Sequence, residues 1–174
     1  MSRAQLKWPG LTCYNTLIIR IDKSEFGIQS KPIEYSGKAF IPKQEAHITV
    51  FGSDLGTHLL QQFTHNPLAE QQVKQAFEST DWRYTKTHDR RHLARENTAL
   101  TGIDKTEESI IMRVKMDGMA EFYSKLKALG LIHKNQPVPP PHVTLYTRNC
   151  DLGIGVHSET ELIKLTSEHI DKPV

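Results

Sequence analysis

Apolar and polar residues alternate along several stretches of this chain, and the alternation predicts mostly strands with a few helices between them. A period of two sends successive side chains to opposite faces of a strand, whereas spacings of three and four place them on one face of a helix. We therefore expect strands at 11–22, 46–52, 109–116 and 142–148, a short hairpin at 31–43, and one or two strands at 81–96. We expect helices at 54–79 with a break near Asn66-Pro67, at 117–129 before Gly130, and in short form after Ser158.

The order of these elements indicates an α+β or mixed α/β fold with two roughly similar halves. A length of 174 residues suits one domain, so we expect residues 1–174 to form a single domain. Apolar residues make up 37% of the chain and charged residues 24%, which is ordinary for a globular protein. The formal net charge of +2 is too small to indicate a nucleic-acid partner by itself.

The two cysteines and the N-terminal residues bear on the cell compartment. Cys13 and Cys150 have no metal-binding or redox spacing, and two cysteines in a chain of this length favour reduced thiols in a cytoplasm. Residues 1–10 contain no apolar core of a signal peptide, and no apolar run is long enough to cross a bilayer. We therefore expect a cytoplasmic protein with no membrane partner.

A short motif occurs twice. "HITVFG" at 47–52 and "HVTLYT" at 142–147 both read histidine, β-branched residue, threonine, apolar residue, aromatic residue, and three prolines precede the second copy. The composition predicts roughly a tenth of one match to the first four positions by chance. One histidine on a strand face is more often structural than catalytic, but two equal copies, one in each half, are what a symmetric site would need.

Strict alternation along each strand places the polar and aromatic side chains of each motif on one face of its own strand. In the first copy that face holds His47, Thr49 and Phe51, and in the second copy it holds His142, Thr144, Tyr146 and Arg148.

Two facing histidines can divide the work of a phosphoryl transfer. A neutral imidazole takes a proton from the attacking hydroxyl, and an imidazolium gives one to the leaving oxygen. A threonine two residues along the same face can donate its hydroxyl to a non-bridging phosphate oxygen. A metal site is the competing interpretation, but neither motif contains an aspartate, glutamate or cysteine beside its histidine at ligand spacing.

The paired "HITV" and "HVTL" motifs resemble those of the 2H phosphoesterase superfamily, whose LigT-like members include RNA 2′,3′-cyclic phosphodiesterases and 2′–5′ RNA ligases. The resemblance implies that His47 and His142 are catalytic and that Thr49 and Thr144 bind the phosphate, without metal or cofactor. It also implies an α+β domain with two pseudo-symmetric lobes. Two antiparallel sheets would line a central cleft in that domain, with the helices outside.

The favoured reaction is the opening of a 2′,3′-cyclic phosphate on an RNA end or a related nucleotide phosphodiester. The first motif runs directly into "FGSD", and the hairpin at 31–43 and the basic segment at 81–96 match no feature of the cyclic-phosphodiesterase branch. A 2′–5′ RNA ligase and a cyclic-oligonucleotide nuclease therefore stay open within the superfamily. A non-catalytic RNA- or nucleotide-binding module and a metal-dependent hydrolase are alternatives from other classes. The acid and base roles, the base preference and the oligomeric state also stay open.

Several further residues are candidates for substrate contacts. Phe51 and Tyr146 could stack on a nucleobase or could simply pack in the interior. Arg148 could bind a phosphate or could be a surface residue without a role. The segment 81–96 mixes arginines with Trp82 and Tyr84, which suits either a nucleic acid or a solvated edge strand.

Overall fold

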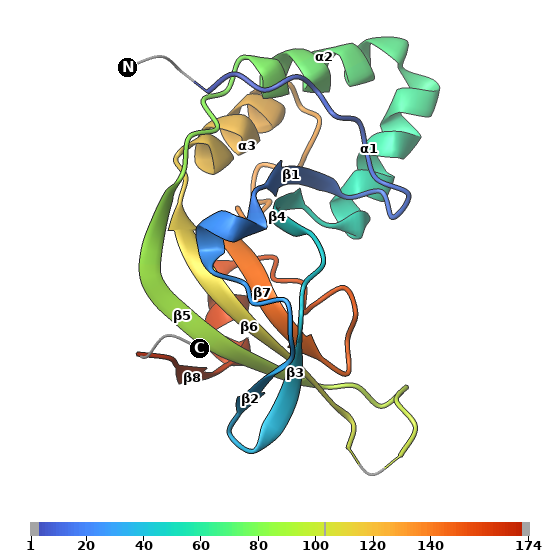
Figure 1. Ribbon diagram of the computed structural model, residues 1–174. Helices are drawn as coiled ribbons and strands as arrows, with labels where there is room; N and C mark the ends of the chain where they lie inside the picture. Colours follow the sequence, from blue (N-terminus) through green and yellow to red (C-terminus); the bar gives the residue numbers. More distant parts are fainter. Residues whose placement is uncertain (1–3, 103, 172–174) are drawn as a thin grey trace.

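The computed structural model describes residues 4–102 and 104–171 of the chain. Its helices α1–α3 gather at one end, and the strands run from there toward a hairpin at the other end (Figure 1). The elements in chain order are β1 (Leu17–Ile21), the 3-10 helix η1 (Lys23–Phe26), β2 (Ile33–Tyr35), β3 (Lys38–Pro42), β4 (Ala46–Phe51), α1 (Ser53–His65), α2 (Pro67–Glu78), β5 (Thr85–Glu96), β6 (Thr106–Lys115), α3 (Gly118–Ala128), β7 (His142–Arg148), α4 (Glu159–Leu165) and β8 (Thr166–His169).

The strands pair in the order β1-β4-β7-β6-β5-β8, and the β2–β3 hairpin joins through a pairing of β3 with β7. Every pairing between these strands is antiparallel. The α+β class is therefore confirmed. The expectation of two separate sheets is not met, because β4 from the first half of the chain pairs directly with β7 from the second.

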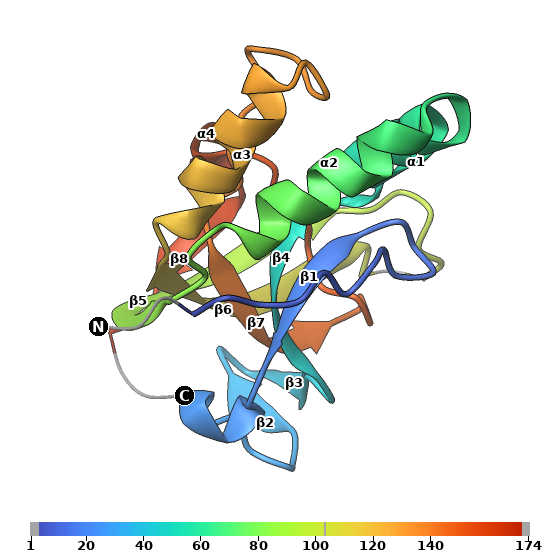
Figure 2. The same ribbon diagram turned by 90° about the horizontal axis from the view of Figure 1, so that it is seen from above.

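The helix boundaries follow the residues that predicted them. Asn66 ends α1 and its side chain accepts a hydrogen bond from the Leu68 amide, while Pro67 opens α2 where a missing N–H costs nothing. Gly130 stands after α3 with a φ of 70°, a left-handed conformation that glycine adopts without strain. The Ser158 side chain accepts a hydrogen bond from the Glu161 amide and so caps α4. Seen from above, α1, α2 and α3 are neighbours in a single group (Figure 2).

Apolar side chains are buried on both faces of the sheet, and β6 shows this directly. Ile110 and Met112 point into the large core that the sheet shares with α1–α3, whereas Ile111 points into a smaller cluster on the other face. The smaller cluster also contains Leu93, Ile154, Val156 and Leu162, from β5, the loop after β7 and α4. The face with the smaller cluster is the one on which the two motifs present their histidines.

Membrane insertion of a helix has no support in the described ranges. None of the helices at 4–102 or 104–171 combines the length and the apolar content that crossing a bilayer requires.

Candidate active site

The two motifs lie side by side on the central strands of the sheet. Strands β4 and β7 pair with Ile48 opposite Val143, so His47 is opposite Thr144 and His142 is opposite Thr49. Directly opposite residues of an antiparallel pair project to the same face, so all four polar side chains share one face. A local two-fold axis through the Ile48–Val143 pair relates the two motifs.

The two histidines are diagonal neighbours across this pair of strands. Such neighbours are about 7–8 Å apart in an antiparallel pair, a separation that leaves room for a phosphate between two side chains. Their electrostatic coupling agrees with this proximity, because the charge of His142 contributes to lowering the pKa of His47. The arrangement can therefore present two imidazoles to one small anion.

His142 is held in a defined tautomer. Its Nδ1 lies 2.8 Å from the carbonyl oxygen of Pro140. A carbonyl only accepts, so Nδ1 carries the proton and Nε2 is free to exchange protons with a substrate. Burial lowers the pKa of His142, whose residue is 8% exposed, and the charge of Arg113 lowers it further, while the hydrogen bond to Pro140 opposes both. The run of three prolines thus supplies a rigid backbone acceptor.

His47 has a different environment. Its Nδ1 is buried and, within the part of the chain that the structure describes, has no hydrogen-bond partner. Burial lowers the pKa of His47 most, and the charges of Lys43, His142 and Arg20 lower it further, while Glu45 raises it. Both imidazoles are therefore biased toward the neutral form by burial and by nearby cations.

Three cationic side chains surround the histidines, and the sequence analysis did not single them out. Arg20 in β1 is opposite His47, and Arg113 in β6 is opposite His142. Lys43 is half-buried, and its Nζ donates to the carbonyl of Asp151 at 2.6 Å. Two of these residues could have been predicted from the sequence, because each is a single arginine inside an apolar run. Arg20 lies in "LIIRI" and Arg113 in "SIIMRVK". An electropositive environment suits an anionic ligand.

A β-bulge follows the threonine of each motif and moves the aromatic residue to the other face. Val50 has no partner in β1, because Ile18 pairs with Thr49 and Leu17 with Phe51. In the same way, Ile111 pairs with Thr144 and Ile110 with Tyr146, which leaves Leu145 unpaired. An extra residue in one strand interrupts its alternation.

The bulges correct the prediction that both aromatic rings line the site. Phe51 and Tyr146 are each 1% exposed and belong to the large core. The Tyr146 hydroxyl accepts a hydrogen bond from the Gln29 amide at 3.0 Å. The packing alternative therefore holds, and neither ring can stack on a base in this conformation.

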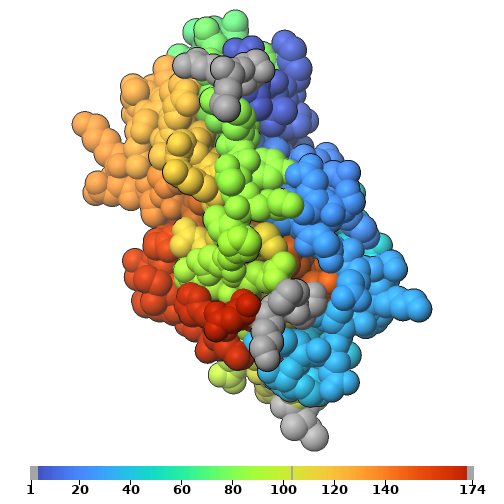
Figure 3. All heavy atoms as spheres, turned by 60° about the vertical axis from the view of Figure 1, so that its left-hand side comes forward, coloured from blue at the N-terminus to red at the C-terminus, as the bar shows by residue number. Residues whose placement is uncertain are grey.

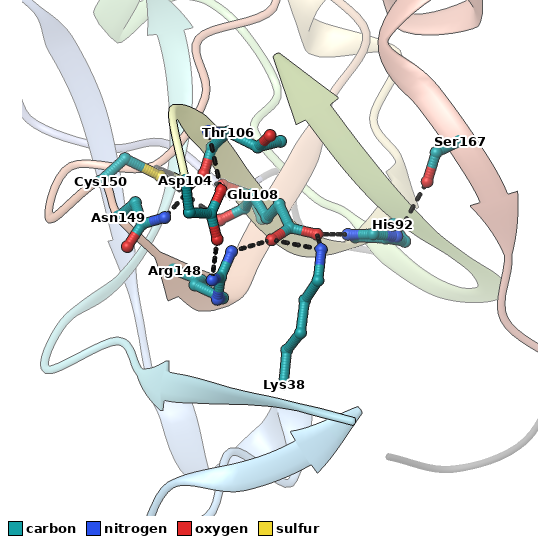
Figure 4. Close-up of polar contacts among 10 residues, drawn as sticks. Lys38, His92, Asp104, Thr106, Glu108, Arg148, Asn149, Cys150 and Ser167 are labelled. Atoms are coloured by element: carbon teal, nitrogen blue, oxygen red, sulfur yellow. Dashed lines mark hydrogen bonds and ion pairs between the residues drawn. The ribbon is translucent and has the colours of Figure 1, made fainter. Parts of the chain in front are cut away.

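Arg148 also leaves the face on which it was predicted. It is opposite Glu108, and its guanidinium donates to the carboxylates of Glu108 and Asp104 (Figure 4). Glu108 is 1% exposed and accepts two more bonds, from Lys38 at 3.0 Å and 3.1 Å, while His92 lies 3.0 Å away. The positive charges of Lys38 and Arg148 offset the charge of this carboxylate, and the contacts of Glu108 link β3, β5, β6 and β7. Because Arg148 belongs to this structural network, it has no role at the site.

The basic segment at 81–96 lies on the surface between the N-terminal and C-terminal parts of the chain, coloured green in Figure 3. Three of its arginines form ion pairs with carboxylates, namely Arg83 with Asp81, Arg91 with Asp89 and Arg95 with Glu107. Trp82 is buried. Most of the segment is β5, and β8 pairs with it only at Arg91–Leu93, so the rest of that side of β5 remains an edge among the described residues. Local pairing of these charges weakens the argument for a nucleic-acid surface there.

Across 4–102 and 104–171, no three histidine, cysteine, aspartate or glutamate side chains come together as a possible metal site. Cys13 and Cys150 are free thiols, the first exposed and the second half-buried.

Comparisons of this chain with protein-family models, with curated proteins and with solved structures found no match.

Proposed function

We propose that this protein is a metal-independent phosphoesterase of the 2H type, which opens 2′,3′-cyclic phosphates on RNA ends or related nucleotide phosphodiesters. One observation carries the proposal. The β4–β7 register brings two histidine–threonine pairs, distant in the sequence, onto one face around a local two-fold axis. In-line displacement at phosphorus needs a base and an acid on opposite sides of the phosphate, and a two-fold pair of histidines meets that need.

The reaction follows from the groups on this face. One neutral imidazole takes a proton from water as the water oxygen bonds to phosphorus. The other, protonated, gives a proton to the ribose oxygen as its bond to phosphorus breaks, and a monoester remains. The Thr49 and Thr144 hydroxyls donate to the non-bridging oxygens, where negative charge increases in the transition state. Proton exchange with water then restores both imidazoles.

The surrounding charges support an anionic substrate. The charges of Lys43 and Arg20 contribute to lowering the pKa of His47, and the charge of Arg113 contributes to lowering that of His142, although burial is the largest cause for both. A bound phosphate would offset this positive charge and raise the pKa of the imidazole that acts as the acid. An arrangement of two pseudo-symmetric lobes and a cytoplasmic location belong to the same proposal. Ligation would use the same two imidazoles, with an RNA 5′-hydroxyl in place of water as the nucleophile that opens the cyclic phosphate.

Turnover in the presence of a chelator tests the proposal. The purified protein is incubated with EDTA and a panel of 2′,3′-cyclic nucleotides, short RNAs and cyclic dinucleotides, and the products are separated by chromatography. We expect opening of the cyclic phosphate, and His47→Ala or His142→Ala should lower the rate by roughly 10²–10⁴-fold, the usual scale for losing a general acid or base. His88→Ala is the matched control, because His88 is exposed on β5.

The same panel separates the alternatives. Binding without turnover of any member would support the nucleotide-binding module, and activity that EDTA abolishes would support a metal-dependent hydrolase. Full activity in the variant that lacks both His47 and His142 would remove the proposal.

A further inference from the structure

Arg113 lies beside the catalytic pair, and the proposed reaction gives it no contact with the substrate. It is opposite His142 in the β6–β7 pairing, and the β4–β7 pairing places His142 opposite Thr49. Arg113, His142 and Thr49 therefore form one row across three strands on a single face. The charge of Arg113 contributes to lowering the pKa of His142, as its place in this row leads one to expect.

The guanidinium of Arg113 is held in place by acidic residues from two other elements. Its Nη1 and Nη2 donate to the two carboxylate oxygens of Glu159, at 2.7 Å and 3.0 Å. The Asp89 carboxylate lies 4.0 Å from Nη1 on the β5 side. A guanidinium has five N–H donors, so the fork to Glu159 leaves donors free for a second anion.

Glu159 belongs to a part of the chain that is fitted against the site. It is the first residue of α4, which the Ser158 cap fixes. The loop that leads to α4 packs on the motif itself, because a Cβ at Gly153 would lie 3.1 Å from the Thr144 methyl carbon and 3.3 Å from its hydroxyl oxygen. The loop and α4 thus form one wall of the site, and Glu159 lies on that wall.

We infer that Arg113 is a phosphate-binding residue of this site and that Glu159 is the positioning residue that orients it. The inference rests on the proposed function, since it concerns the same phosphate. Arg113 donates to a non-bridging oxygen on the His142 side and offsets the charge that accumulates there in the transition state. Glu159 restrains the long side chain before the substrate arrives, so less conformational freedom is lost on binding.

Arg20 shows what an arginine without this support looks like. It is the counterpart of Arg113 across the local axis, because it is opposite His47. The side chain of Arg20 is 66% exposed, and its contact with Glu45 is 3.7 Å long. The side chain of Arg113 is 24% exposed and makes two short hydrogen bonds to Glu159. The local two-fold axis therefore relates the backbone positions of the two arginines, but of these two side chains it is Arg113 that an acidic residue restrains.

Binding of inorganic phosphate, measured by isothermal titration calorimetry, is the direct test. We expect Arg113→Ala to weaken phosphate binding roughly 10- to 100-fold, as for the loss of a hydrogen bond to a charged group, and Arg113→Lys to restore part of it. Arg95→Ala is the matched control, because Arg95 is on the next strand and is paired with Glu107, away from the carboxylates that hold Arg113. Thermal unfolding of each variant shows whether it remains folded.

A rescue experiment separates the positioning role of Glu159 from a structural one. Guanidinium ion added to Arg113→Ala should occupy the vacated position and restore phosphate affinity, because Glu159 still holds the cation. The same ion should not rescue the variant that combines Arg113→Ala with Glu159→Ala. With the cyclic nucleotide as substrate, Glu159→Ala alone should raise KM more than it lowers kcat, and Glu159→Asp should recover part of the loss.

The outcomes distinguish this inference from the proposed function. Unchanged phosphate binding in Arg113→Ala, or no phosphate binding by the wild type, overturns the inference, and the histidine variants still decide the function. If the wild type hydrolyses no member of the panel but binds phosphate through Arg113, the proposed function fails and the binding role of Arg113 stands. Rescue by guanidinium without Glu159 overturns the positioning role.

Discussion

The two halves of the site, β1–β4 and β7–β6, have the same backbone plan and different side-chain environments. In each half a histidine is opposite the threonine of the other motif, an arginine lies on the next strand outward, and a bulge follows the threonine. His142 is buried and bonded to a carbonyl, whereas the buried Nδ1 of His47 has no partner in the described part of the chain. Strand register thus creates the symmetry, and the flanking loops remove it.

The largest expected effect comes from removing either histidine. If both halves take part in the same proton-transfer reaction, His47→Ala and His142→Ala each lower kcat by roughly 10²–10⁴-fold, and the double variant loses little more. Initial rates with a 2′,3′-cyclic nucleotide measure this. Full activity in either of the two single-histidine variants would show that the two histidines do not act as a catalytic pair.

The two threonines test whether both halves bind the phosphate. Thr49→Val and Thr144→Val keep the branched shape and remove only the hydroxyl. Each should lower kcat by about 10²–10³-fold, the range for one donor to a developing negative charge. A loss confined to one of the two would mean that only that half contacts the oxygen that gains charge, and kcat determined at saturating substrate measures it.

The pH dependence should show the shared bias of both halves toward neutral imidazole. Burial and nearby cations lower both pKa values from 6.5, so each ring protonates only at a pH below its ordinary value. A reaction that needs one neutral and one charged ring then has a bell-shaped kcat/KM profile with its maximum below pH 6.5. Lys43→Met removes a cation near His47, so it should raise that pKa and move one limb to higher pH. A maximum above pH 7 in the wild type would contradict this.

The smallest expected effect concerns the aromatic residues that the bulges bury. Tyr146→Phe removes the hydrogen bond to the Gln29 amide, so it should lower the free energy of unfolding by about 0.5–1.5 kcal/mol. Its KM should not change, because the ring faces the core. Urea unfolding and steady-state kinetics measure the two quantities. A raised KM with unchanged stability would return Tyr146 to the substrate side.

The sequence predicted what depends on local patterns. The strand at 142–148, the helix break at Asn66-Pro67 and the Ser158 cap all follow from nearby residues, and each is present in the structure. The sequence also predicted that the two histidine–threonine motifs act together, because the same motif occurs on two strands. Their common face in the structure follows from the β4–β7 register, which is a long-range property.

What the sequence did not predict depends on contacts between distant segments. The bulges at Val50 and Leu145 arise from pairing with β1 and β6, so strict alternation misplaced Phe51, Tyr146 and Arg148. The short polar strand β8 has no apolar alternation, and only its pairing with β5 makes it a strand.

The carbonyl of Pro140 has a consequence for any survey of this protein by mutation. The atom that fixes the His142 tautomer belongs to the main chain, and every amino acid at position 140 would supply the same oxygen. A scan of single substitutions would thus pass over one of the constraints on this histidine. Replacing the peptide bond after Pro140 with an ester, which weakens the carbonyl as an acceptor, would reveal it.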